Sequence, residues 1–148
     1  LGDVYKRQFH GPGQIVGYPI LDLERIGIGL RDYIAALEQA VIDAVAHYGV
    51  AAGRIAGASG VWIDAAGTRP RKICAVGVRS SRYVTMHGFA LNVSTDLRYF
   101  DHINPCGFTD RGVTSLERET GRRVSIAEVK ELLVKTLSEN LNVKIYKN

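Results

Sequence analysis

Cys106 stands between Pro105 and Gly107 in the stretch "NPCGFTDRG", an unusual setting for a core thiol. Proline stiffens the approach to the thiol, and glycine leaves the sulfur unobstructed, with the Gly107 backbone amide beside it. This arrangement would present an accessible nucleophile. Free cysteine is often a small buried hydrophobic residue, and the local sequence leaves that alternative open.

A nucleophilic cysteine needs a base or a cation nearby, because its thiol is mostly protonated at neutral pH. Lys72 opens the apolar run "KICAVGV", and a desolvated lysine there could act as a base. Alternatively, Lys72 lies at the solvated end of the turn "TRPRK". Cys74, inside the same run, is expected to be buried and inert. The other candidate helpers of Cys106 are His10, His87 and His102.

The segment "HGPGQ" at residues 10–14 is a second rigid turn that could approach a ligand closely. It is not a dinucleotide fingerprint, because the third glycine is displaced to Gly17 and no strand precedes it. It is not a phosphate-binding P-loop either, because no Gly-Lys-Ser/Thr follows. Simple loop closure remains the alternative.

The bulk composition favours a single globular domain and argues against several classes of protein. The chain has 148 residues, 46% apolar and 23% charged, with no apolar run of about 18–20 residues that could span a membrane. Two cysteines without CxxC spacing and four histidines without HxxxH spacing argue against zinc, and reduced thiols in a cytoplasm are expected. The net charge of +4 favours an acidic partner. The basic cluster at 69–82 has one aromatic residue at its far end, Tyr83, so a solvated face is favoured over nucleic-acid binding.

Hydrophobic periodicity predicts the elements that must position these residues. A strand is expected over 14–23, with Pro19 near an edge or bulge, and three strands at 60–64, 72–81 and 85–94 are expected to form an antiparallel meander. A helix is expected over 29–48, with Gly49 as its C′ residue. Its apolar stripe consists of Tyr33, Ile34, Leu37, Val41, Ala44, Val45 and Tyr48.

The sequence of the C-terminal third predicts irregular structure followed by two helices. Residues 96–104 favour a short helical or irregular crossing, and "NPCGFTDRG" a loop. A capping box of Thr114 and Glu117 opens a short helix closed by Gly121, and Ser125 caps the last helix, 125–141. The stripe of that helix consists of Ile126, Val129, Leu132, Leu133, Leu137 and Leu141. The predicted class is α+β (α/β-type), a mostly antiparallel sheet flanked by helices.

Five segments in this order resemble one family. The segments "FHGPGQIVGYPILDL", "SGVWI", "RKICAVGVR", "HGFALNV" and "NPCGFTDRGVTSL" are similar to the lipoyl(octanoyl) transferases. The resemblance covers about residues 9–138 and implies the fold of the biotin and lipoate protein ligase catalytic domain, used without ATP. It implies transfer of an octanoyl group from acyl carrier protein to a lysine of lipoyl-carrier domains, through a cysteine thioester and without a cofactor or metal. The implied carriers are E2 subunits of 2-oxoacid dehydrogenases and the H protein of glycine cleavage.

The resemblance implies a role for specific residues. It assigns a catalytic pair to Cys106 and Lys72. Amides of the 72–77 strand or of Gly107 would stabilise the oxyanion. The residues implied to shape the acyl slot and bind substrate are His10, Gly11, Gly13, Gln14, Gly77, His87, Gly88 and Gly107.

The sequence departs from the family at its start. Family members carry several tens of residues before "HGPGQ", whereas "LGDVYKRQ" stands here and does not match them. Residues 1–8 are therefore expected to be foreign or disordered, and residues 9–148 to be a partial catalytic domain. Two alternatives remain: an ATP-dependent lipoate or biotin ligase, against which the "PCG" turn argues, and a truncated non-catalytic module that binds acyl carriers.

Overall fold

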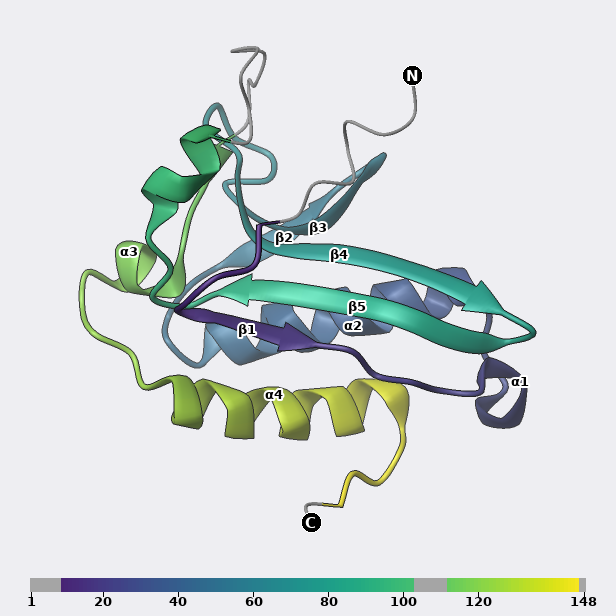
Figure 1. Cartoon of the computed structure of the whole chain (residues 1–148). Coiled ribbons are helices and arrows are strands. Elements are labelled where there is room, and N and C mark those ends of the chain that lie inside the picture. Colours follow the sequence, from purple (N-terminus) through teal and green to yellow (C-terminus); the bar gives the residue numbers. More distant parts are fainter. Residues whose placement is uncertain (1–8, 103–111, 147–148) are drawn as a thin grey trace.

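A mixed β-sheet forms the centre of the computed structural model, which describes residues 9–102 and 112–146 (Figure 1). Among these residues the strands form one six-stranded sheet in the order β1-β5-β4-β3-β2, with β6 paired to β4. The strands are β1 Gln14–Gly17, β2 Ala52–Ile55, β3 Ala58–Ile63, β4 Arg71–Ser81, β5 Val84–Asn92 and β6 Gly112–Val113.

The predicted meander is confirmed: β3, β4 and β5 pair antiparallel in chain order. The β4–β5 hairpin turns at Arg82 and Tyr83, whose φ angles of 49° and 67° are those of a type I′ turn. On the other side of β5, β1 pairs antiparallel with Gln14 opposite Asn92. The "HGPGQ" turn therefore lies at the same end of the sheet as the start of β4.

β6 supplies the one parallel pairing among the described strands. It places Gly112 opposite Arg71 and Val113 opposite Lys72. The next residue continues the contact, since the Thr114 amide donates to the Lys72 carbonyl at 2.9 Å. The chain that follows the "PCG" segment is thus fixed beside Lys72.

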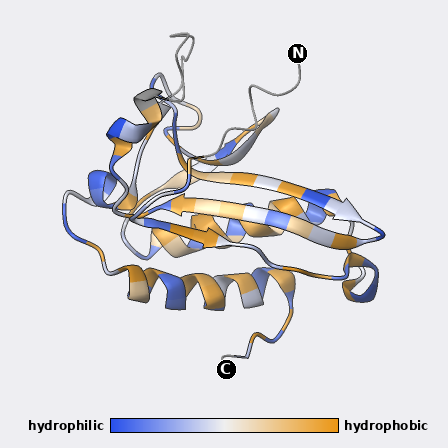
Figure 2. Cartoon of the chain, viewed as in Figure 1, coloured by the Kyte–Doolittle hydropathy of each residue, from blue (hydrophilic) through white to orange (hydrophobic). Residues whose placement is uncertain are grey.

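Two long helices provide the core on one side of the sheet. Helix α2, Leu30–Ala46, packs on β2 to β5, and α4, Ile126–Leu141, packs along α2 (Figure 1). Figure 2 shows hydrophobic and hydrophilic residues alternating along α4, as an amphipathic helix requires. Both predicted stripes enter the core: Tyr33, Leu37, Val41, Ala44, Val45, Val129, Leu133, Leu137 and Leu141 are buried, and the other members are partly buried.

Several local predictions are confirmed. Helix α4 begins after Ser125, whose side chain accepts from the Glu128 amide. Residues Leu97–His102 form a 3-10 helix, η2, within the segment expected to be helical or irregular. Gly49 has a positive φ of 75°, but α2 ends at Ala46 with His47 as its C-cap, so Gly49 lies one residue further from the helix than the predicted C′ position. The predicted fold class, a mostly antiparallel sheet flanked by helices, is confirmed.

Other predictions need correction. The strand expected over 14–23 ends at Gly17, since Pro19 has no backbone N–H to continue the ladder; the chain meets β5 again in a single bridge between Asp22 and Val84, and Asp22 then caps a short helix, α1 Leu23–Ile26. Helix α3, Leu116–Thr120, is capped by Ser115 rather than by Thr114, and the Ser115 side chain accepts from the Arg118 amide. Strands β2 and β6 were not predicted. In the described ranges no helix has the length and apolar character needed to cross a membrane.

Candidate active site

A cavity of about 180 Å³ opens where β1, β5, β4 and β6 meet. Cavities of roughly 150 Å³ already hold a benzene-sized ligand, so this one is large enough for part of an organic substrate. Phe9 and Phe100, whose rings pack edge to face at 5.5 Å between centroids, form one apolar wall. The complete lining is Phe9, Gln14, Ser59, Lys72, Ala75, Val76, Ala90, Asn92, Phe100 and Val113.

Lys72 provides the cationic group of the cavity. It lies opposite Trp62 in the β3–β4 register, and its Nζ is 4.7 Å from the centroid of the indole ring. Gly60 leaves the space for the lysine stem, because a Cβ there would approach the Lys72 Cε to 3.3 Å. The Lys72 side chain is thus held half-buried between a ring, a glycine and the cavity.

The "HGPGQ" turn is fixed to the end of β5. Gly13 has a φ of 85°, and a Cβ there would lie 2.6 Å from the backbone carbon of Ser94, so only glycine fits without strain. Its carbonyl accepts from the amides of Val93 and Ser94 at 3.1 and 3.0 Å. Gln14 closes the turn by accepting from the Gly11 amide at 3.2 Å.

Asn92 connects this turn to the strand segment beside Lys72. Its Oδ1 accepts from the Gln14 side-chain amide at 2.8 Å, and its Nδ2 donates to the Thr114 carbonyl at 3.1 Å. Thr95 adds a weaker hydrogen bond to the same Oδ1 at 3.4 Å. Since Asn92 is only 5% exposed, losing these bonds would leave buried polar groups without partners.

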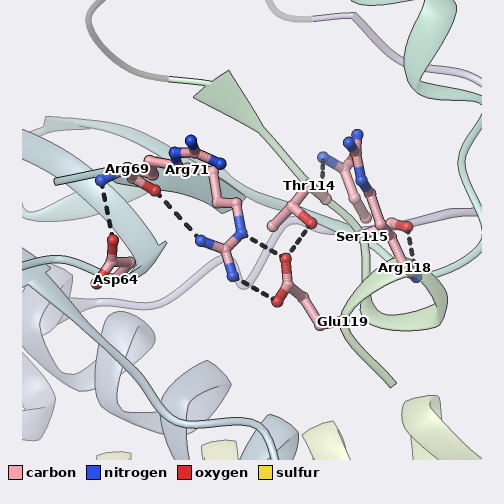
Figure 3. A network of polar contacts seen from close by, with 8 residues as sticks. Asp64, Arg69, Arg71, Thr114, Ser115, Arg118 and Glu119 are labelled. Carbon is pink, nitrogen blue, oxygen red and sulfur yellow. Dashed lines mark hydrogen bonds and ion pairs between the residues drawn. The ribbon is translucent and has the colours of Figure 1, made fainter. Parts of the chain in front are cut away.

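A carboxylate on α3 joins the start of β4, next to Lys72, to the segment after β6 (Figure 3). Glu119 accepts two hydrogen bonds from the Arg71 guanidinium, at 2.6 and 2.7 Å, and one from the Thr114 hydroxyl at 2.5 Å. The hydrogen bonds from Arg71 hold the pKa of Glu119 below its usual value. One ionised side chain therefore clamps β4 to the segment after β6, and we call this contact the Glu119 clamp.

The predicted site residues separate into groups. Lys72 and Gln14 line the cavity, and Gly11 and Gly13 build the turn that precedes Gln14. His10 belongs to the same turn, is exposed, and is not among the cavity-lining residues.

A second predicted group lies further along the hairpin. Gly77 and Gly88 are opposite each other in β4 and β5, outside the cavity lining. A Cβ on Gly88 would collide with the carbonyl oxygen of Gly17, so this glycine allows β1 to approach β5. His87 is exposed and adopts a φ of 66°. The predictions for Cys106, Gly107, residues 1–8 and the His102 side chain lie outside what the structure describes.

The second cysteine behaves as expected. Cys74 has no exposed surface, and burial strongly raises the pKa of its thiol. A thiol in this state is a poor nucleophile. Among the described residues, no group of three or more histidine, cysteine or acidic side chains gathers as a metal site.

Three positioning residues were not singled out from the sequence. Trp62 lies in a quoted family segment but reads as an ordinary core aromatic. Asn92 is the polar residue that ends an apolar run, a signal that could have indicated a buried hydrogen-bonding role. Glu119 has no local signal, because its partners are brought to it by the fold.

Comparison with known proteins identifies similar chains. Residues 8–138 match the family described as lipoyl protein ligase A/B catalytic domain. An octanoyltransferase of Bacteroides fragilis (strain YCH46) is 62% identical over 129 residues, which are 87% of this chain and 58% of that protein. An octanoyltransferase of Porphyromonas gingivalis is 61% identical over 133 residues, 89% of this chain and 27% of that protein. The chain thus spans little more than half of the first relative's length and about a quarter of the second relative's length.

Solved structures show the same fold. A biotin protein ligase from Aquifex aeolicus superposes with a TM-score of 0.67 at 21% identity, covering 88% of this chain and 53% of the ligase. A bipartite lipoate protein ligase from Thermoplasma acidophilum gives a TM-score of 0.63 at 19% identity, covering 94% and 55%. At these identities the likeness concerns the arrangement of the backbone alone.

Proposed function

The chain belongs to the lipoyl protein ligase A/B catalytic domain family, and from this membership we propose that it carries the catalytic centre of an octanoyltransferase. The proposed reaction moves an octanoyl group from acyl carrier protein to a lysine of a lipoyl-carrier domain, a step of lipoate biosynthesis. Relatives 61–62% identical to this chain bear the name octanoyltransferase, which supports this choice over an ATP-dependent ligase.

The observation that carries the proposal is the place of Lys72. It lines a partly apolar cavity, next to Val113 of the strand that follows the "PCG" segment. Phe100, six residues before Cys106, and Val113, seven residues after it, line the same cavity. At about 3.3–3.6 Å per residue, a chain tethered at these two points can bring Cys106 to Lys72.

The proposed chemistry has two balanced steps. In the first, the Cys106 thiolate attacks the carbonyl carbon of the octanoyl thioester, and the carrier's thiol leaves after receiving a proton from Lys72. In the second, the neutral amine of the target lysine attacks the new thioester, and Lys72 takes up the proton released as the amide forms. Cys106 departs as the thiolate, so the pair returns to its starting state.

The remaining site residues have roles in this reaction. The apolar surfaces of Ala75, Ala90 and Phe100 suit an acyl chain, while backbone amides of β4 or of Gly107 would receive the charge on the oxyanion. No nucleotide or metal enters either step. We further propose a reducing compartment, the cytoplasm, because the mechanism needs Cys106 as a thiol.

The partners follow from the same proposal. The donor is octanoyl-acyl carrier protein, and the acceptors are the lipoyl domains of E2 subunits and the H protein of glycine cleavage. The chain has a net charge of +4, which would favour the approach of acidic carriers.

Mass spectrometry tests the proposal directly. The chain is incubated with an octanoyl thioester and no ATP, and an octanoyl adduct is expected on Cys106. Cys106→Ala should give no adduct, and Lys72→Ala should form it about 10²–10⁴-fold more slowly. An adduct that requires ATP, or that forms on another residue, would contradict the proposal.

Lys72→Arg separates two roles of the lysine. Arginine keeps the positive charge but does not release its proton at a useful pH, so activity should not be restored. If this variant kept most of the activity, Lys72 would act as a fixed cation beside the thiolate, and another group would relay the proton.

A further inference from the structure

Trp62 is the side chain whose contact with Lys72 bears on the chemistry of the site. The two residues are register partners in β3 and β4, and the lysine Nζ lies over the ring at 4.7 Å from its centroid. The ring is only 5% exposed, and its Nε1 donates to the Ala58 carbonyl at 3.1 Å. Its orientation is therefore set by packing and by a hydrogen bond at its edge, and the lysine ammonium lies over its face.

An aromatic face attracts the ammonium form of lysine and has no comparable attraction for the neutral amine. The attraction is larger where water is excluded, as beside this buried ring. The contact therefore favours the protonated lysine, whereas burial alone would favour the neutral amine. The position of Trp62 opposes a resting state in which Lys72 is a free base.

We infer that Trp62 is a positioning residue that holds Lys72 over its ring as an ammonium ion between turnovers. This inference rests on the proposed function and specifies its starting state. Lys72 then acts first as the acid that protonates the departing carrier thiol. It becomes the neutral base only for the second step, when the target amine attacks, and returns to the ammonium form as the amide is made.

Several acids around this end of β4 make contacts of their own: Asp64 accepts from the Arg69 amide and Glu117 from the Val124 amide. Glu38 of α2 forms an ion pair with Arg54 at 3.0 Å, and Arg71 is held by Glu119. The charged or titratable side chains described near this end of β4 include Glu38 on α2, Arg54 on β2, Asp64 and Arg69 between β3 and β4, Arg71 and Cys74 on β4, and Glu117, Arg118 and Glu119 on α3. The ring is a cation-binding surface placed directly on Lys72, and its contact is the observation on which the inference rests.

The composition of the chain makes the inference unusually testable. Trp62 is the single tryptophan, so all tryptophan fluorescence comes from the ring that contacts Lys72. Growth on 5-fluorotryptophan or 5,6-difluorotryptophan changes this one residue with almost no change in shape, while each fluorine weakens the electrostatic attraction of the ring face for a cation. A buried ring can therefore be tested without a cavity-forming substitution.

The experiment is a pH titration of tryptophan emission in the chain without an acyl donor. Wild type is expected to show an alkaline step that is missing in Lys72→Met, which keeps the stem and removes the ammonium group. Tyrosine ionisation is common to both proteins and cancels in their difference. A cation–π contact is worth roughly a two- to thirtyfold change in the proton dissociation constant, so two fluorines should raise that constant about two- to fivefold.

The outcomes separate the inference from the function on which it rests. The role of Trp62 is overturned if the alkaline step in emission occurs in both wild type and Lys72→Met. It is also overturned if fluorination leaves the midpoint of that step unchanged. In the acyl-transfer assay, Trp62→Leu should shift the alkaline limb of the pH profile to lower pH, and Trp62→Phe should shift it less. An unshifted limb in Trp62→Leu also counts against the inference. Failure of wild type to form any acyl-enzyme counts instead against the proposed function.

Discussion

Replacing Glu119 by glutamine tests whether the Glu119 clamp stabilises the junction beside Lys72. The substitution keeps the shape and one acceptor but removes the charge that faces Arg71. Charged hydrogen bonds contribute about 1.5–3 kcal/mol, whereas exposed ion pairs contribute about 0–1 kcal/mol. Because the Arg71 and Glu119 side chains are 32% and 14% exposed, the clamp lies between these cases. We expect Glu119→Gln to lower the free energy of unfolding by about 2 kcal/mol.

Thermal unfolding followed by circular dichroism measures this loss. For a domain of this size, 2 kcal/mol corresponds to a decrease in Tm of roughly 4–8 °C. The matched control is Arg98→Gln, which breaks an equally short ion pair with Asp96 at 2.6 Å whose side chains are 87% and 37% exposed. The control should leave the Tm unchanged, because solvent screens an exposed pair.

The pH dependence gives a second check. The pKa of Glu119 is lowered from 4.5 by its hydrogen bonds with Arg71, so its stabilising effect is fully present above about pH 4.5. The effect is lost as the pH falls through the lower pKa of the folded state. The Tm difference between wild type and Glu119→Gln should therefore shrink in acid. A difference that stays constant to about pH 3, or a variant as stable as wild type at neutral pH, would refute the clamp.

Three further predictions concern individual residues. Iodoacetamide should label Cys106 first and Cys74 only on unfolding, since Cys74 has no exposed surface; peptide mapping that finds Cys74 labelled first in the folded chain contradicts this. Gly13→Ala should destabilise the chain by more than about 2 kcal/mol, because a positive φ is combined with a backbone collision. Gly27→Ala, with a φ of 72° and open space around it, should cost about half as much, and equal losses in Tm would exclude the collision. Asn92→Leu should cost about 2–4 kcal/mol in urea unfolding by leaving buried partners unpaired, and a loss below about 1 kcal/mol would show that water replaces it.

Elements with strong local periodicity were predictable. Helix α4 has a capping serine at Ser125 and a regular apolar stripe, and β4 and β5 alternate around a tight turn. Elements defined by pairing with distant parts of the chain were not predictable. Strand β2 has four residues, one of them Gly53, and shows no alternation. Strand β6 has two residues and exists because Lys72 and its neighbour offer hydrogen-bonding partners.

The site residues likewise divide into those indicated by the sequence and those that depend on contacts made by the fold. The spacing alone favoured a solvated Lys72, and the family resemblance assigned this residue to the site; the structure places it in the lining of the cavity. The choice of cap at α3 could not be made from spacing, since Thr114 and Ser115 are adjacent and either can cap a helix. Thr114 is withdrawn from capping because its hydroxyl donates to Glu119. This contact depends on the fold and has no trace in the local sequence.

The parallel pairing of β6 with β4 has a consequence for the order of folding. Neighbouring strands β3, β4 and β5 are joined by short connections, so they can pair early at a small cost in loop-closure entropy. Gly112 must meet Arg71 across about forty intervening residues, and only two residues pair when it does. Such a contact forms late and opens at low free energy, before the sheet itself unfolds. Native-state hydrogen exchange should therefore show the Thr114 amide, which donates to Lys72, exchanging faster than the amides between β4 and β5.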